Sequence, residues 1–103
     1  MMEQEISRVQ VVLDETWLEM GQLCRMAGVT ELWVCQRMED GLLAPTVREP
    51  TEPPRFNADD LRRVRRMASL ERDFDAVPEL ASLVAELEQE IAVLREKLRR
   101  LGG

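Results

Sequence analysis

The chain has 103 residues, of which 45% are hydrophobic, 33% charged and only 4% aromatic. This size and composition predict one small, helix-rich globular domain, or such a domain with an appended helix. The chain contains no histidine and no tyrosine, and its formal net charge is −6. These numbers argue against most acid–base catalysis and metal binding, and they differ from the basic composition of proteins that bind nucleic acid.

Two short helices follow a predicted strand near the N-terminus. Residues 6–13 (ISRVQVVL) are rich in β-branched side chains and alternate loosely, which predicts a strand. Residues 22–27 (QLCRMA) predict a short helix that Gly28 ends, and residues 31–40 predict a second one. Two short helices separated by the turn GVT are typical of a helix-turn-helix.

The start of the first helix is open to two interpretations. Thr16 and Glu19 fit a capping box, which would begin a helix there. Alternatively, residues 17–20 are extended and Gly21 caps a later helix. We prefer the second interpretation.

The second helix has clear end signals. Thr30 is a good N-cap, Glu31 lies near the positive end of the helix dipole, and Gly41 ends the helix. Its predicted apolar stripe, with Cys35 in the middle, consists of Leu32, Trp33, Val34 and Met38.

The middle of the chain predicts a loop and then two long helices. Three of the five prolines lie in residues 46–56, so this segment predicts an extended loop or a wing-like hairpin, with Phe56 returning to the core. Asn57 then caps a helix at 58–74, which the sequence DAVP breaks. The last helix is predicted at 79–101.

That last helix carries the strongest periodic pattern of the chain. Its apolar residues repeat every seven positions and form an a/d seam over about three heptads. In a parallel pair, Glu90 would face Arg95 of the second copy. We predict self-association through this seam, the alternative being a helix that folds back on its own domain. The seam consists of Leu80, Val84, Leu87, Ile91, Leu94, Leu98 and Leu101.

Charge is distributed unevenly along the chain. Residues 1–57 hold ten acidic and five basic side chains, whereas residues 58–103 hold ten and nine. The predicted helix-turn-helix is therefore in the acidic half. The run RRVRR (62–66) attracts phosphate, but acidic side chains flank it at helical spacing, so we interpret it as a solvated, self-paired helix face.

The remaining features exclude several classes of function. Cys24 and Cys35 form no CxxC motif, which predicts two buried thiols in a reducing cytosol and not a metal or redox sensor site. No clustered nucleophile and base, and no glycine-rich phosphate loop, is found, so we expect no enzymatic activity and no cofactor. The N-terminus has no basic segment of the signal-peptide type, which predicts a cytoplasmic protein without a membrane span.

The segment from Gly21 to Arg66 resembles the MerR-type winged helix-turn-helix. Its frame is GQLCRMAGVT, EDGLLAP and RFNADDLRRV. The family usually has an Arg-Tyr-Tyr-Glu run in the second helix, and here these positions are occupied by residues 35–38 (CQRM), so the first cation is lost. The wing keeps Arg55 and Phe56 but lacks the family's glycine and tyrosine.

Nearly the whole chain is similar to the chaperone-modulator family of CbpM-like proteins. The order of strand, LCRMAGVTELWVCQRMEDGLLAP, proline-broken wing, FNADDLRRVRR and a short C-terminal helix carries this resemblance. In that family the strand runs nearly into LC, which favours extended structure at residues 17–20. The resemblance implies a protein that binds the J-domain of a CbpA-type, DnaJ-like co-chaperone and inhibits it by covering its basic Hsp70-binding surface.

The sequence therefore predicts a mainly α, MerR-like winged helix-turn-helix domain at 1–75, with a short N-terminal strand, and a C-terminal amphipathic or coiled-coil helix at 76–103. Exposed charges of the second helix are the candidate J-domain contacts, namely Glu31, Arg37, Glu39 and Asp40. The alternative is a MerR-like regulator that binds DNA, which the three carboxylates in this set oppose.

Overall fold

The computed structural model describes residues 17–45 and 52–102. The strand predicted at 6–13, together with Thr16 and residues 46–51 of the predicted loop, lies outside these ranges. The described elements are β1 (Leu18–Glu19), α2 (Met20–Ala27), α3 (Glu31–Glu39), β2 (Arg55–Phe56), α4 (Ala58–Phe74) and α5 (Pro78–Leu101).

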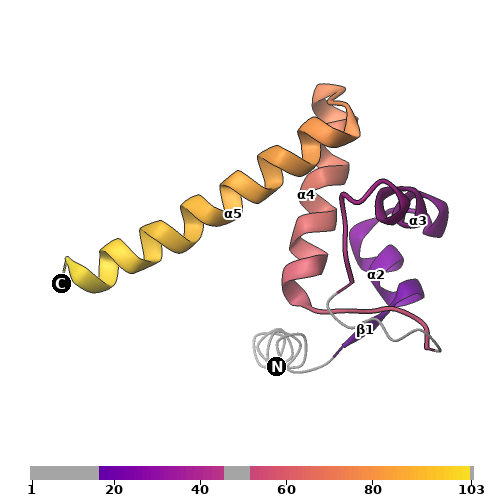
Figure 1. Ribbon diagram of the computed structural model, residues 1–103, viewed down its shortest axis with the longest axis horizontal. Helices are drawn as coiled ribbons and strands as arrows, with labels where there is room; N and C mark the ends of the chain where they lie inside the picture. Colours follow the sequence, from indigo (N-terminus) through magenta and orange to yellow (C-terminus); the bar gives the residue numbers. More distant parts are fainter. Residues whose placement is uncertain (1–16, 46–51, 103) are drawn as a thin grey trace, which may run out of the picture.

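The architecture is mainly helical, as predicted, and α4 stands at its centre (Figure 1). Helices α2 and α3 lie on one side of α4, and α5 leaves from its C-terminal end and diverges on the other side. None of the described helices combines the length and the apolar character that crossing a membrane requires. The central position of α4 makes it the element against which both α2–α3 and α5 are oriented.

A two-residue antiparallel ladder closes the helix-turn-helix at its base. Leu18 of β1 pairs with Phe56 of β2, and Glu19 pairs with Arg55. Leu18 and Phe56 are both buried, which confirms the prediction that Phe56 returns to the core. Because side chains alternate across a strand, the register that buries Phe56 also sends its neighbour Arg55 outward.

The start of α2 differs from the prediction in one detail. Residues 18–19 are extended, as expected, but the helix begins at Met20, and Gly21 lies inside it. Glu19 is the N-cap, because its side chain accepts from the backbone of Gln22 while the Gln22 side chain accepts from the Glu19 backbone. This reciprocal pair satisfies two backbone donors that a glycine cap would have left to water. Gly28 ends the helix in the left-handed conformation, as predicted.

Helix α3 begins and ends close to the predicted residues. The Thr30 side chain accepts from the Trp33 backbone at 3.0 Å, which confirms this N-cap. The predicted apolar stripe is only partly correct: Val34 is buried, whereas Leu32 is 68% exposed. Cys35 is exposed as well, so only one of the two cysteines predicted to be buried, Cys24, lies in the core.

Helices α4 and α5 meet at a sharp joint. Asn57 caps α4 through a reciprocal pair with Asp60, as predicted, and α5 begins with Pro78 at its first position. Asp75 ends α4 with a φ of 54°, in the left-handed region. Next to this joint, Ala81 and Ala85 of α5 are buried against Met67 and Leu70 of α4.

Candidate partner-binding surface

The inward side of α3 is locked to α4 by a single carboxylate. Arg37 is only 8% exposed, and its Nε donates to Glu71 Oε2 at 3.0 Å while its Nη2 donates to Glu71 Oε1. The Trp33 Nε1 also donates to Glu71 Oε1, at 3.1 Å. The Arg37 guanidinium lies 4.5 Å from the Trp33 ring centroid, within cation–π range.

This arrangement corrects the sequence-based view of Arg37. We expected Arg37 among the outward charges of the helix, but it points into the body and its fork is held in bidentate fashion by Glu71. Arg37 is therefore a structural residue that fixes how α3 sits on α4, and it does not belong to the exposed surface. Glu71 was missed as its partner, because it lies 34 positions further along the chain and no local pattern connects the two residues.

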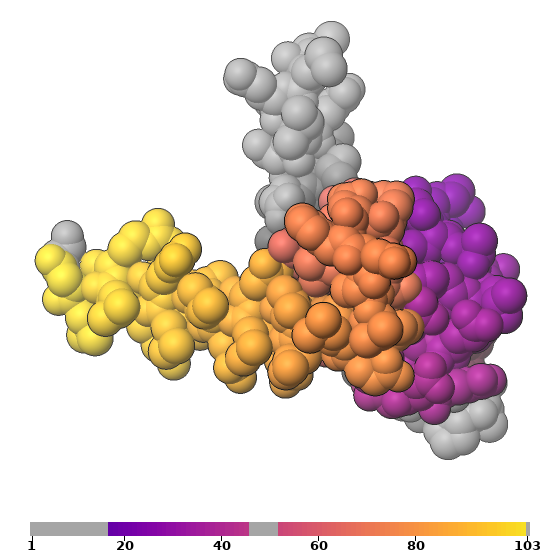
Figure 2. All heavy atoms as spheres, turned by 90° about the horizontal axis from the view of Figure 1, so that it is seen from above, coloured from indigo at the N-terminus to yellow at the C-terminus, as the bar shows by residue number. Residues whose placement is uncertain are grey.

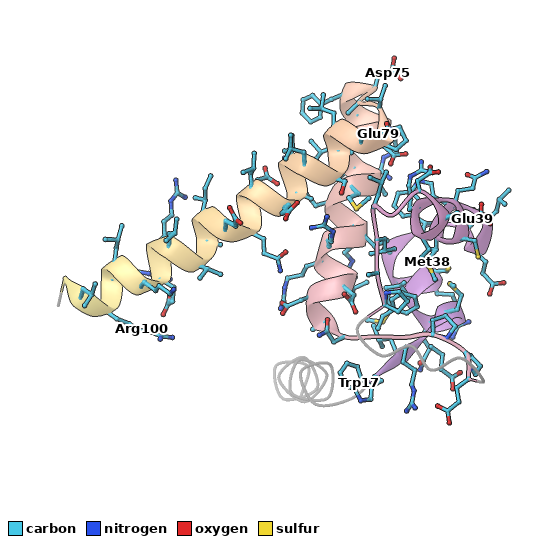
Figure 3. All side chains as sticks on the ribbon, viewed as in Figure 1. Trp17, Met38, Glu39, Asp75, Glu79 and Arg100 are labelled. Atoms are coloured by element: carbon cyan, nitrogen blue, oxygen red, sulfur yellow. The ribbon has the colours of Figure 1, made fainter. Side chains whose placement is uncertain are left out.

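The outward side of α3 is acidic. The three predicted carboxylates are exposed, and none of them has an ion pair within the described residues. Figure 3 shows Glu39 on the side of α3 that faces away from α4. We refer to this surface as the α3 face, and it consists of Glu31, Leu32, Cys35, Gln36, Glu39 and Asp40.

The arginine cluster of α4 is occupied by partners inside the molecule. Arg62 pairs with Asp59 on its own helix, as a self-paired face predicts. The other three reach different elements: Arg63 donates to Ser82 Oγ at 2.9 Å, Arg65 to the Met26 carbonyl at 2.9 and 3.1 Å, and Arg66 to Glu88 at 2.7 and 2.9 Å. The cluster therefore fastens α4 to both of its neighbours, which the self-paired interpretation had not anticipated.

The seam of α5 is exposed along most of its length. Val84 is partly buried against the Met67 cluster, so this seam residue packs within its own chain. The other six are exposed, from 47% at Leu87 and Ile91 to 85% at Leu101. Figure 2 shows the C-terminal half of α5 extending away from the rest of the described chain. The alternative prediction, a helix that folds back on its own domain along its whole length, is therefore wrong. Self-association through the seam stays a prediction.

Of the two cysteines, Cys24 is the buried one. Burial raises the pKa of the Cys24 thiol, and the nearby Glu31 carboxylate adds to this effect, so Cys24 stays protonated at neutral pH. Within residues 17–45 and 52–102, no group of three His, Cys, Asp or Glu side chains is placed to hold a metal ion. What this part of the chain presents instead is charge on α3 and apolar surface on α5.

Comparison with known proteins gives one family. A family model described as "MerR HTH family regulatory protein" matches residues 18–102, which is most of the chain and covers every described helix. Neither the curated proteins nor the solved structures yielded a match.

Proposed function

The chain belongs to the MerR HTH family of regulatory proteins, and on that premise we propose that it regulates by binding a partner protein through the α3 face. The partner is the J-domain of a CbpA-type, DnaJ-like co-chaperone. Binding covers the basic surface that the J-domain offers to its Hsp70 chaperone, so the protein inhibits co-chaperone activity without any chemistry of its own.

The observation that carries this proposal is the charge of the α3 face. A helix that reads DNA needs outward cations and amides for phosphates and base edges. The α3 face offers one amide, Gln36, and three carboxylates that have no ion pair within the described residues. The arginine of helix α3, Arg37, is turned inward. A polyanion would be repelled by such a surface, whereas a basic protein surface complements it. The exposed side chain of Leu32 supplies an apolar contact in the middle of the carboxylates.

The test is calorimetry of the full chain with the isolated J-domain at physiological salt. We expect saturable one-to-one binding that weakens as salt is raised, because screening reduces attraction between exposed charges. Reversing two carboxylates with Glu39→Lys and Asp40→Lys should weaken binding roughly ten- to a hundredfold.

A matched control separates the α3 face from net charge. The double variant Asp73→Lys and Glu86→Lys changes net charge by the same amount at exposed positions on α4 and α5. We expect its affinity to stay within about twofold of the parent. Equal losses in the two variants, or no loss in the α3 variant, would contradict the assignment of this face.

DNA binding is the second candidate, and the family match together with the helix-turn-helix geometry favours it. A salt-dependent shift of duplex DNA, abolished by changes on the α3 face and accompanied by no heat with the J-domain, would select this function instead.

A further inference from the structure

The joint between α4 and α5 opens into a groove. The two helices pack closely near the joint, where Ala81 and Ala85 are small enough to let the backbones approach. They then diverge, and Figure 1 shows the two forming a V. Between them lies an open groove of about 560 Å³, lined by residues of α4 and by residues of α5 from Ala85 to Arg100. This groove is separate from the α3 face, which lies on the other side of α4.

The chemistry of the groove is amphipathic. Its apolar side chains come from α5, namely Ala85, Ala92 and Val93. Its cations come from both helices, namely Arg62, Arg63, Arg66, Lys97 and Arg100. Three carboxylates also line it, so the five cations leave the groove with a net positive charge, in a chain whose formal charge is −6.

Two of these cations have no anionic partner within the described residues. Lys97 has no partner within the described residues, and Arg63 is held by a neutral hydroxyl, that of Ser82. In contrast, Arg66 is matched by Glu88, and Arg100 shares Glu96 with Arg99. The unmatched positive charge is thus found on both sides of the groove, one cation on α4 and one on α5. An occupant that reaches both sides with carboxylates would complement both.

The length and shape of the groove fit a helix. From Ala85 to Arg100 the α5 side spans sixteen residues, or about 22 Å at the rise of an α-helix. This is the length of about four helical turns, and a slot between two diverging helices is a site where a third helix packs. Duplex DNA is a poor fit, because it has no apolar face for Ala92 and Val93 to cover.

We propose that the α4–α5 groove binds an amphipathic helix of a partner protein whose apolar face contacts Ala92 and Val93 and whose acidic flanks pair with Arg63 and Lys97. This surface is independent of the proposed J-domain contact and takes a partner of the opposite charge. The protein would then hold a basic partner on α3 and an acidic one between α4 and α5.

The test uses the full chain and a fluorescent sixteen-residue synthetic helix, with leucine at i, i+3 and i+4 spacing and glutamate at the flanking positions. The comparison peptide has lysine in place of each glutamate. Fluorescence anisotropy should show saturable binding of the glutamate peptide, at least tenfold tighter than that of the lysine peptide.

Two variants on the same helix turns provide the matched comparison. Lys97→Glu with Arg100→Glu reverses charges that line the groove, whereas Arg95→Glu with Arg99→Glu reverses two exposed arginines that do not. We expect the first variant to lose at least tenfold in affinity for the glutamate peptide and the second to lose less than threefold. Val93→Asp, at a half-exposed position, should also lose tenfold while leaving the thermal unfolding temperature near that of the parent.

Several results would overturn the proposal. Equal losses in the two charge variants, or no preference for the glutamate peptide, would show that the groove does not select an acidic helix. Displacement of the peptide by duplex DNA would assign the groove to phosphate. A dimer that Lys97→Glu with Arg100→Glu dissociates would make a second copy the occupant. Because Glu39→Lys with Asp40→Lys should leave peptide binding unchanged, failure of the J-domain proposal is distinguishable from failure of this one.

Discussion

Helices α3 and α5 both expose a face that the fold does not use for its own packing, and the two faces are chemically opposite. The α3 face presents three carboxylates, whereas the exposed seam of α5 presents leucine and isoleucine from Leu80 to Leu101. Carboxylates are stable in water, so the α3 face needs no partner to be soluble. A contiguous apolar seam is different, because a soluble chain gains free energy by covering it.

This difference indicates which of the two surfaces gains more free energy when a partner covers it. The packed part of α5 contributes mainly small side chains, Ala81 and Ala85, with Val84 partly buried beside them, while the leucines and the isoleucine of the seam stay exposed. Burying the large side chains would release more free energy than burying the alanines, and folding of this chain leaves most of that free energy unrealised. We expect substitutions in the seam to change self-association. Substitutions in α3 should change how α3 is oriented on α4 and which partner the protein binds.

The largest expected effect comes from the seam. Leu87→Asp with Leu94→Asp should convert a dimer to a monomer and weaken association by at least about a thousandfold, because four leucines are lost from each pair at roughly 1.5–3 kcal/mol apiece. Light scattering across a concentration series measures it. Val93→Asp, next to Leu94 but off the seam, is the control and should leave the dimer intact. A parent protein that is already monomeric would contradict self-association.

The next largest effect is expected from breaking the contact of Glu71 with α3. Glu71→Ala leaves the guanidinium of Arg37 partly buried and unpaired, and we expect the free energy of unfolding to fall by about 3 kcal/mol. Urea denaturation measures this. Asp73→Ala removes the exposed partner of Arg72 on the same helix and should cost less than about 0.5 kcal/mol. Similar losses in the two variants would mean that Glu71 does not act as a lock.

The cap of α3 should have a smaller effect. Thr30→Ala removes the acceptor for the Trp33 backbone N–H and should lower the free energy of unfolding by about 1 kcal/mol. Thr30→Ser retains an oxygen at the same place and should recover most of the loss. Thermal unfolding of the three proteins compares them, and an Ala variant as stable as the Ser variant would exclude this capping contact.

The smallest effect concerns the contact between α4 and α5. The Arg66 guanidinium holds the pKa of Glu88 below its ordinary value. The folded state thus favours the carboxylate, and this contribution is present at neutral pH and is lost as the pH falls through the lowered pKa. The difference in unfolding free energy between the parent and Glu88→Gln should therefore shrink between pH 6 and about pH 3. A difference that stays constant with pH would contradict this role of the pair.

Features set by near neighbours were predictable from the sequence. The caps at Thr30 and Asn57 bond to residues three positions away, so the chain itself carries both partners. For the same reason α4 has the predicted bounds, and α3 and α5 are within one residue of theirs. The exposed positions of Glu31, Glu39 and Asp40 followed from the polar positions of α3.

Features set by distant residues were not predictable. The partner of Arg37 is 34 positions further along the chain, and nothing near Arg37 indicates which side of the helix it takes. Three adjacent apolar residues, 32–34, surround more than half of the α3 axis and so do not define a buried side. This is why Leu32 was assigned to the core and Arg37 to the surface, when the structure has them the other way round.

Asp75 adopts the left-handed conformation at the joint, and this gives it an influence on the direction of α5 that its exposed side chain does not suggest. Glycine, asparagine and aspartate adopt a φ of 54° readily, and β-branched residues do not. Beyond this residue α5 runs for 24 residues, or about 36 Å. A rotation of about 10° at one backbone position would therefore swing the tip of the helix through about 6 Å, as a rigid lever does. Together with the packing of Ala81 and Ala85 on α4, the backbone conformation of Asp75 thus determines where the exposed C-terminal half of α5 lies.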